Sequence, residues 1–271
     1  MLKILHGSDF HFGKPHLPQS SLGFLEIAND INPNIIVLSG DFTQRAKVEE
    51  YRLAKNFLGS LLNVPIVVTP GNHDIPLYRF GQRLLNPFRN YREFISQDLD
   101  TVTRIDGAIF VALNSADPYR SIINGRINQD QLEFAADAFL GSSSGDIKVL
   151  VMHHPLVHSP DHEKHGILPE STLLLESFND MGVELILGGH VHRAFTSHMK
   201  VNVDEKRIGG ATLIVHSGTT ASNRGRAHEK RRNTLNVLEL SSADIKVETY
   251  WHEQEEGVFV AREVNAFRRR T

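Results

Sequence analysis

Five short motifs rich in Asp, His and Asn constrain this chain most, because each follows an apolar run typical of a β-strand. In chain order they are Asp9-x-His11, Gly40-Asp41, Gly71-Asn72-His73-Asp74, His153 and Gly189-His190-x-His192. Side chains at the end of a strand point into the crevice beside the sheet, where α/β proteins bind ligands. We therefore expect the five motifs to meet at one end of a sheet.

The N-terminal part of the chain alternates between strand and helix patterns. Lys3–His6, Ile35–Leu38 and Pro65–Thr69 are short β-rich runs, while Leu22–Ile31 and Val48–Leu62 repeat apolar residues at helical spacing. This β-α-β-α-β order predicts parallel strands joined by crossover helices.

The middle of the chain continues with both kinds of element. Val102–Ile105 and Ile109–Leu113 flank Asp106-Gly107, which is a strong signal for a hairpin turn. Tyr78–Gln97 is less regular, and we expect it to be partly helical and to cover the site. The remaining elements are two helices and two strands, at Asp130–Leu140, Ser171–Met181, Lys148–Met152 and Glu184–Leu187.

The C-terminal part favours strands with short connections. Four runs fit this pattern and are expected to pair antiparallel: Thr212–His216, Leu235–Leu240, Ile245–Trp251 and Gly257–Ala261. Lys200–Gly210 is expected to be an exposed hairpin or loop, and Arg268–Arg270 a solvated tail. We interpret residues 1–271 as a single domain, with 235–271 as its C-terminal β extension.

Composition limits the class of protein. A chain of 271 residues with 40% hydrophobic and 23% charged residues is typical of globular proteins. Its net charge of −3 provides no overall attraction for nucleic acid, although a local patch still could. The absence of cysteine excludes disulfides and thiolate zinc sites. Without a signal-peptide pattern or a long apolar run, we expect a cytoplasmic location and no membrane partner.

The side chains of the motifs suit particular metals. Carboxylate, imidazole and amide groups bind divalent or trivalent Mn, Fe and Zn ions. Two such ions held about 3.5–4 Å apart can clamp the attacking and leaving oxygens of a displacement at phosphorus. Asp41 has two oxygens and is the natural bridge between the two ions.

Together the five motifs resemble the calcineurin-like metallophosphoesterase superfamily, whose pattern is D-x-H, G-D, G-N-H-D/E, H and G-H-x-H. The resemblance implies an α/β fold, a four-layer α/β/β/α sandwich of two mixed β-sheets flanked by helices. It also implies two sets of metal ligands that share one carboxylate. These sets are Asp9, His11, Asp41 and His192 for the first metal, and Asp41, Asn72, His153 and His190 for the second.

The resemblance further implies a reaction, in which a hydroxide that bridges the metals attacks the phosphorus of an ester. His73 would lie outside the ligand sets, as general acid or phosphate donor, and Asp74 would orient its other ring nitrogen. Asn72 would also face the substrate. The ending Gly-His-Val-His-Arg looks like the bacterial cyclic-nucleotide phosphodiesterase branch, so we expect a small phosphodiester, either a cyclic nucleotide or a glycerophosphodiester.

Three other functions remain open for this chain. The first is a nuclease of the DNA-repair type, which the basic stretch Arg224–Arg232 favours and the net charge disfavours. The second is a phosphomonoesterase, which the same metal site can serve. The third is a scaffold that has lost catalysis, which predicts missing ligands. The partner would be a small phosphate ester, and both a monomer and a homodimer are compatible with the sequence.

Several residues have both a structural and a functional interpretation. Arg224 and Arg226 could bind the anionic substrate or lie in a solvated connection. His6 is expected in the core, His154 is expected to pack beside its neighbour, and His16 could line the pocket or lie at the surface. A loop carries His158, His162 and His165, for which a solvated loop is favoured over a third metal site.

Overall fold

The structure is a computed structural model that describes residues 1–120, 124–143, 145–160, 166–198, 212–226 and 229–269. Its first sheet has the order β12-β11-β10-β1-β2-β3, and β1, β2 and β3 run parallel. The other neighbours are antiparallel. The strands are β1 (Leu2–Gly7), β2 (Ile35–Leu38), β3 (Ile66–Val68), β10 (Thr234–Leu240), β11 (Asp244–Glu253) and β12 (Val258–Arg268).

The second sheet is also mixed, with the order β4-β5-β6-β7-β9-β8. Its strands are β4 (Thr101–Ile105), β5 (Ala108–Ala112), β6 (Ile147–Val151), β7 (Leu185–Gly188), β8 (Phe195–His198) and β9 (Leu213–His216). The predicted hairpin is confirmed, because Ile105 pairs with Ala108 across Asp106-Gly107. Gly107 adopts φ 79°, a conformation that suits a residue without a Cβ atom.

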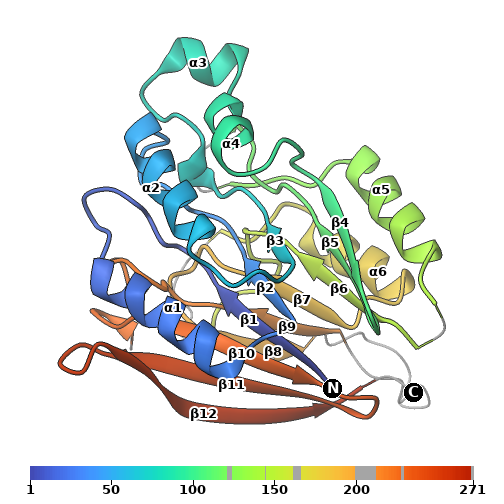
Figure 1. Ribbon diagram of the computed structural model, residues 1–271. Helices are drawn as coiled ribbons and strands as arrows, with labels where there is room; N and C mark the ends of the chain where they lie inside the picture. Colours follow the sequence, from blue (N-terminus) through green and yellow to red (C-terminus); the bar gives the residue numbers. More distant parts are fainter. Residues whose placement is uncertain (121–123, 144, 161–165, 199–211, 227–228, 270–271) are drawn as a thin grey trace.

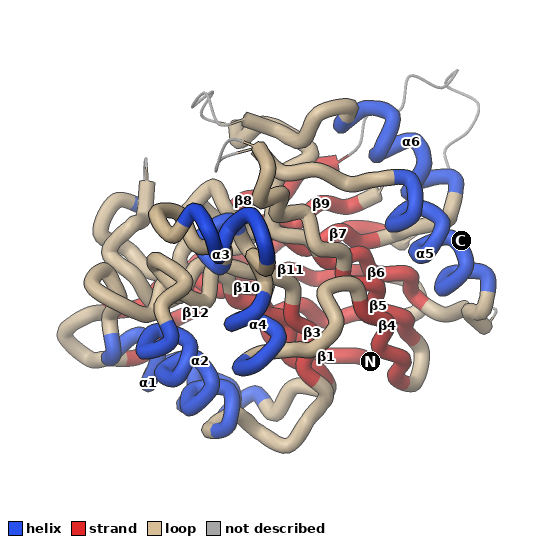
Figure 2. Tube along the Cα trace, turned by 90° about the horizontal axis from the view of Figure 1, so that it is seen from above, coloured by secondary structure: helices blue, strands red, loops and turns tan. Residues whose placement is uncertain are grey.

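Helices cover the outer faces of both sheets. Figure 2 shows α1 and α2 on one side of the strands and α5 and α6 on the other, so the predicted four-layer α/β/β/α arrangement is confirmed. The helices are α1 (Pro18–Ile31), α2 (Val48–Gly59), α3 (Phe80–Leu85), α4 (Arg89–Phe94), α5 (Gln129–Leu140), α6 (Ser171–Asp180) and the 3-10 turn η1 (Asn72–Asp74). Helices α3 and α4 lie at one end of the sandwich (Figure 1). They make Tyr78–Gln97 helical in two short pieces.

Strand periodicity explains this layering. On β2, Ile36 and Leu38 pack in the cluster that includes α1 and α2, while Ile35 and Val37 pack in the cluster between the two sheets. All four side chains are buried because both faces of the strand are covered. Each contributes roughly 1.5–3 kcal/mol of hydrophobic stabilisation. The alternation thereby fixes which face of β2 each side chain covers, and the parallel direction of β1, β2 and β3 places their polar motifs at the same end of the sheet.

Three expectations about the C-terminal part are wrong. Strand β9 pairs parallel with β7, and its antiparallel partner is β8, which is not among the predicted strands. The last strand continues beyond Ala261 to Arg268, because it pairs with β11 along its whole length. Arg269 is not a solvated tail residue, since its guanidinium donates to both carboxylate oxygens of Glu184 at 2.9 Å.

The expected loop Lys200–Gly210 lies outside the described residues, as does Arg270. Among the described helices, none combines the length and the apolar character that a membrane span requires.

Candidate metal centre

One group of four buried side chains comes together at the ends of three strands. Asp9 and His11 follow β1, Asp41 follows β2 and His192 follows β7. One ligand atom from each of the four residues lies within 4.8 Å of the others. We call these four residues the first group. Its members come from both sheets, so the site lies across the edge of the sandwich rather than at the edge of one sheet.

A second group adjoins the first through Asp41. The Oδ2 atom of Asp41 lies 3.6 Å from Nε2 of His11 and 3.4 Å from Nε2 of His153. The rings of His153 and His190 meet edge to face, with centroids 5.2 Å apart. His190 Nδ1 lies 2.9 Å from the side-chain oxygen of Asn72. We call Asp41, Asn72, His153 and His190 the second group, and Asp41 lies between the two.

The backbone is unusual at these positions. Asp9, His11, Asp41, His190 and His192 all have positive φ angles, between 48° and 71°. This left-handed region is sparsely populated by residues other than glycine, and such outliers are typical of functional sites. The conformation turns each side chain off its strand end toward the same space.

Glycines beside these residues make the close approach possible. A Cβ atom on Gly71 would collide with Asp41, and one on Gly189 would collide with Ser8 and Asp9. Gly40, at φ 92°, leaves room for the ring of His153. The glycines of the motifs are therefore required by packing around the site.

The donor atoms fit bound cations. Among the described residues, Asp9 Oδ1, Asp41 Oδ2, His11 Nε2 and His153 Nε2 are buried side-chain atoms without a hydrogen-bond partner. Buried polar atoms are almost always paired, so four unpaired atoms in one place require another partner. Carboxylate oxygens and imidazole nitrogens are ligands that Mn, Fe and Zn accept. The cluster is suited to two metal ions.

Electrostatics keeps Asp41 ionised. Burial alone would raise the pKa of Asp41, but the neighbouring His153 and His73 outweigh burial and hold that pKa well below its ordinary value. Burial lowers the pKa of His11, His190 and His192 well below the ordinary value for histidine. These three imidazoles are therefore neutral at pH 7, which is the form that binds a metal ion.

His73 lies beside both groups, with its ring centroid 4.8 Å from that of His11. Its backbone N–H donates to Asp41 Oδ1 at 2.8 Å. Its Nδ1 lies 2.9 Å from the backbone carbonyl oxygen of Gln44, which can only accept a hydrogen bond. Nδ1 therefore carries a proton, and Nε2 is the ring nitrogen that can hold a second proton and transfer it to a substrate.

The expectation that Asp74 orients His73 is wrong. The carboxylate of Asp74 instead accepts hydrogen bonds from the backbone N–H groups of Gly71, Phe42 and Thr43, at 2.9, 3.2 and 2.8 Å. It thereby ties the turn η1 to the segment after β2. The carbonyl of Gln44, three residues after Asp41, takes the orienting role, and backbone groups of this kind carry no signal in a sequence.

Arg224 reaches the metal centre from the C-terminal half of the chain. Its Nη1 donates to the side-chain oxygen of Gln44 at 3.0 Å. Burial lowers the pKa of Arg224, and the carboxylates of Asp41 and Asp9 partly offset this effect. Arg226 lies beside the first group, because its backbone N–H donates to the carbonyl of His192 at 3.2 Å. The Ser222–Arg226 loop is therefore part of the site's border.

Two other histidines lie where the sequence predicts. His6 is buried in the core and bonds to the hydroxyl of Ser39 at 2.9 Å. The ring of His154 packs against that of His190, with centroids 4.6 Å apart, and its Nδ1 bonds to the hydroxyl of Ser115 at 2.9 Å. Adjacent residues at a strand end diverge, so only His153 faces Asp41.

Of the remaining predicted histidines, the two that the structure describes, His16 and His158, do not join the two groups. The ring of His16 packs on Phe12, with centroids 4.2 Å apart, and its Nδ1 bonds to the carbonyl of Phe10. His158 is exposed, while His162 and His165 lie outside the described residues. The preference for a solvated loop over a third metal site therefore stays a prediction.

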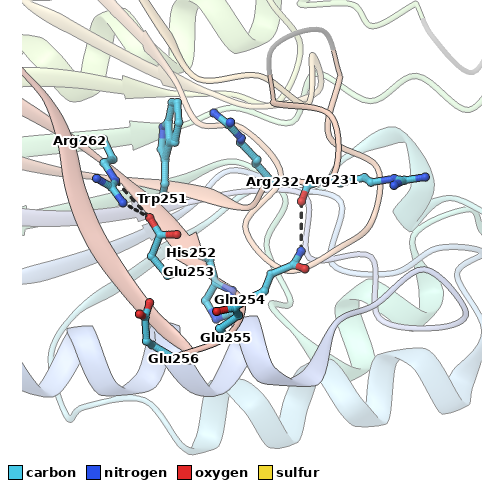
Figure 3. Close-up of a pocket in the computed structure, with 9 residues that line it drawn as sticks. All are labelled: Arg231, Arg232, Trp251, His252, Glu253, Gln254, Glu255, Glu256 and Arg262. Carbon is cyan, nitrogen blue, oxygen red and sulfur yellow. Dashed lines mark hydrogen bonds and ion pairs between the residues drawn. The ribbon is translucent and has the colours of Figure 1, made fainter.

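A cavity of about 550 Å³ lies apart from these two groups (Figure 3). Its lining combines charged side chains with Trp251, whose ring is covered by the guanidinium of Arg232 at 4.3 Å. Arg262 forms an ion pair with Glu253 in the same wall. None of the residues in the two groups lines this cavity, and its charged side chains partly satisfy one another.

The chain belongs to the calcineurin-like phosphoesterase family, because the model of that family matches residues 2–194. That span contains every residue of the two groups. The family predicted from the five motifs is therefore confirmed.

Individual relatives share the fold or a segment of the sequence. "Glycerophosphodiester phosphodiesterase GpdQ" of Enterobacter lignolyticus is 31% identical over 81 residues, which are 26% of this chain and 29% of that protein. A purple acid phosphatase from yellow lupin superposes with a TM-score of 0.72 at 12% identity, over 99% of this chain and 54% of that one. A dimetal phosphatase from Danio rerio gives a TM-score of 0.66 at 10% identity, over 98% of both chains. At these identities the two structures show the fold alone.

Proposed function

We propose that the protein is a metal-dependent phosphoric ester hydrolase that acts on a small phosphodiester, either a cyclic nucleotide or a glycerophosphodiester. The observation that carries the proposal is the position of Asp41, whose unpaired Oδ2 faces both His11 and His153. A carboxylate in that position can bridge two metal ions. The two groups supply complete ligand sets for them, which disfavours a scaffold that has lost catalysis.

The ligand sets divide as the two groups do. Asp9, His11, Asp41 and His192 would hold one ion, and Asp41, Asn72, His153 and His190 would hold the other. When bound, the ions supply a water made acidic enough to attack at neutral pH, and positive charge that stabilises the transition state.

The protein's own residues then handle the phosphate and the leaving group. Arg224 holds a phosphate oxygen through its guanidinium, whose fork matches phosphate geometry, and Arg226 adds positive charge beside it. His73 donates a proton from Nε2 to the departing oxygen, while its Nδ1 stays bonded to the carbonyl of Gln44. Asn72, in the second group, faces the substrate through the same side-chain amide that would bind the metal ion.

The preference for a diester has one support outside the site. The relative that matches 81 residues of this chain carries the name of a glycerophosphodiester phosphodiesterase. Because the match covers only part of both chains, it supports the reaction type more than the identity of the substrate.

A direct comparison of substrates tests the proposal. Purified protein loaded with Mn²⁺ is assayed with bis(p-nitrophenyl) phosphate and with p-nitrophenyl phosphate, which share the leaving group. We expect the diester to have the higher kcat/KM, and cyclic nucleotides and glycerophosphodiesters to be hydrolysed in a second screen. A strong preference for the monoester would overturn the diester assignment, and salt-sensitive cleavage of single-stranded DNA would favour a nuclease.

A further inference from the structure

We infer that Gln44 is a positioning residue that joins the phosphate-binding arginine to the leaving-group histidine. The inference rests on the proposed function and adds to it a residue that belongs to neither metal-ligand group. It starts from two contacts of one residue. The side chain of Gln44 bonds to Arg224, and its backbone carbonyl bonds to His73.

The chemistry of the first contact fixes its direction. A guanidinium can only donate, so the amide oxygen of Gln44 must be the atom that faces Arg224 at 3.0 Å. Arg224 is half-buried and comes from a loop 180 positions further along the chain. It lies near Arg226 and Arg45, whose positive charges repel it. Without Gln44, the guanidinium would lose the acceptor that sets its direction toward Asp41 and Asp9.

The segment around Gln44 is held rigidly from several sides. Thr43 bonds to Asp74, and the backbone N–H groups of Arg45 and Lys47 both donate to the carboxylate of Glu50. The carbonyl of Ala46 accepts hydrogen bonds from further side chains, those of Arg79 and Asn90, at 2.6 and 3.0 Å. Ala46 itself adopts φ 54°.

This number of contacts on one short loop has a functional explanation. Catalytic groups lose rate steeply when they are misplaced by about 1 Å, so the residue that holds two of them must itself be held. Gln44 therefore fixes the distance between the phosphate oxygen bound by Arg224 and the proton carried by His73.

The test compares Gln44→Ala and Gln44→Met with wild type in the metal-loaded protein. Gln44→Met keeps most of the side-chain volume but removes the acceptor. We expect both variants to raise KM for bis(p-nitrophenyl) phosphate about tenfold and to weaken binding of inorganic phosphate by a similar factor. The dependence of kcat on leaving-group pKa should be unchanged, because both variants keep the backbone carbonyl of residue 44 that accepts the hydrogen bond from His73. Gln129→Ala, on the exposed face of α5, is the matched control and should behave as wild type.

A double-mutant cycle with Arg224→Ala separates positioning from packing. If Gln44 acts through Arg224, adding Gln44→Ala to Arg224→Ala should change neither KM nor phosphate affinity further. Additive effects, or wild-type behaviour of Gln44→Met, would overturn the inference. Phosphate binding by wild type without hydrolysis of any ester would reject the proposed function, while the binding cycle would still decide the role of Gln44.

Discussion

The two groups that meet at Asp41 are held in different ways. In the first group, Asp9, His11 and His192 present buried donor atoms without any hydrogen bond between their side chains, and their carboxylate–imidazole distances are 3.5–3.8 Å. In the second group, Asn72 and His190 are joined by a direct hydrogen bond of 2.9 Å. The first group is therefore open to a cation, while the second must exchange a hydrogen bond for one.

The contacts that support the two groups also differ. The first group is supported by backbone contacts, such as the hydrogen bond from His11 N–H to the carbonyl of Asp41 at 2.9 Å. The second group is supported by buried histidines. His153 bonds to the carbonyl of Ser39, whose hydroxyl bonds to His6, and His216 bonds to the carbonyl of Gly189 beside His190. We therefore expect the first site to bind metal more tightly and the second to depend more on pH.

The largest effect should come from the residue that both groups share. Asp41→Asn removes the charge between the ions, so we expect both metal equivalents to weaken together and kcat/KM to fall at least about a thousandfold. Metal content by mass spectrometry and diester hydrolysis measure this. Full activity, or loss of only one equivalent, would contradict the bridging role.

A smaller effect should follow when one group is disrupted and the other is left intact. We expect His11→Ala to lose the metal of the first group and Asn72→Ala that of the second, each with a loss of a few hundredfold in kcat/KM, about 3 kcal/mol. Titration of wild type with Mn²⁺ should show two steps, and Asn72→Ala should retain only the tighter one. If Asn72→Ala kept the weaker step instead, the assignment of affinities would be reversed.

Outside both groups, His73 should affect turnover without affecting metal content. His73→Ala removes the proton donor, so we expect kcat to fall about a hundredfold, most for substrates with poor leaving groups. Its metal content should equal that of wild type. An equal loss across leaving groups of different pKa would remove His73 from proton transfer.

The smallest effect concerns the histidines behind the second group. Burial lowers the pKa of His216 to about 4 and that of His6 to about 3, from 6.5. Because the folded pKa is depressed, each neutral imidazole contributes stability that is fully present above pH 6.5 and is lost as pH falls toward those values. Between pH 7.5 and 5.5 we expect a loss of about 1 kcal/mol per histidine in the free energy of unfolding.

Urea unfolding of metal-free protein at the two pH values measures that loss. His216→Gln keeps an amide donor for Gly189 and cannot titrate, so its midpoint should shift less with pH than that of wild type. An equal shift in the variant would show that His216 does not carry the effect.

The sequence determined the order of elements and the identity of the ligand types. Strand periodicity at Ile35–Leu38 and the Asp106-Gly107 turn are local, since they depend on side-chain alternation and turn geometry that neighbouring residues impose. The five motifs at strand ends were likewise local, and they were sufficient to indicate the family.

Only the tertiary structure decided what depends on distant parts of the chain. Strand β9 is parallel because it lies beside β7, and Arg269 is held because Glu184 lies within reach; both are contacts between distant segments. The same holds in the site, where Gln44 rather than Asp74 orients His73 and also holds Arg224. A backbone carbonyl has no residue identity, so its role appears only when the chain is folded around it.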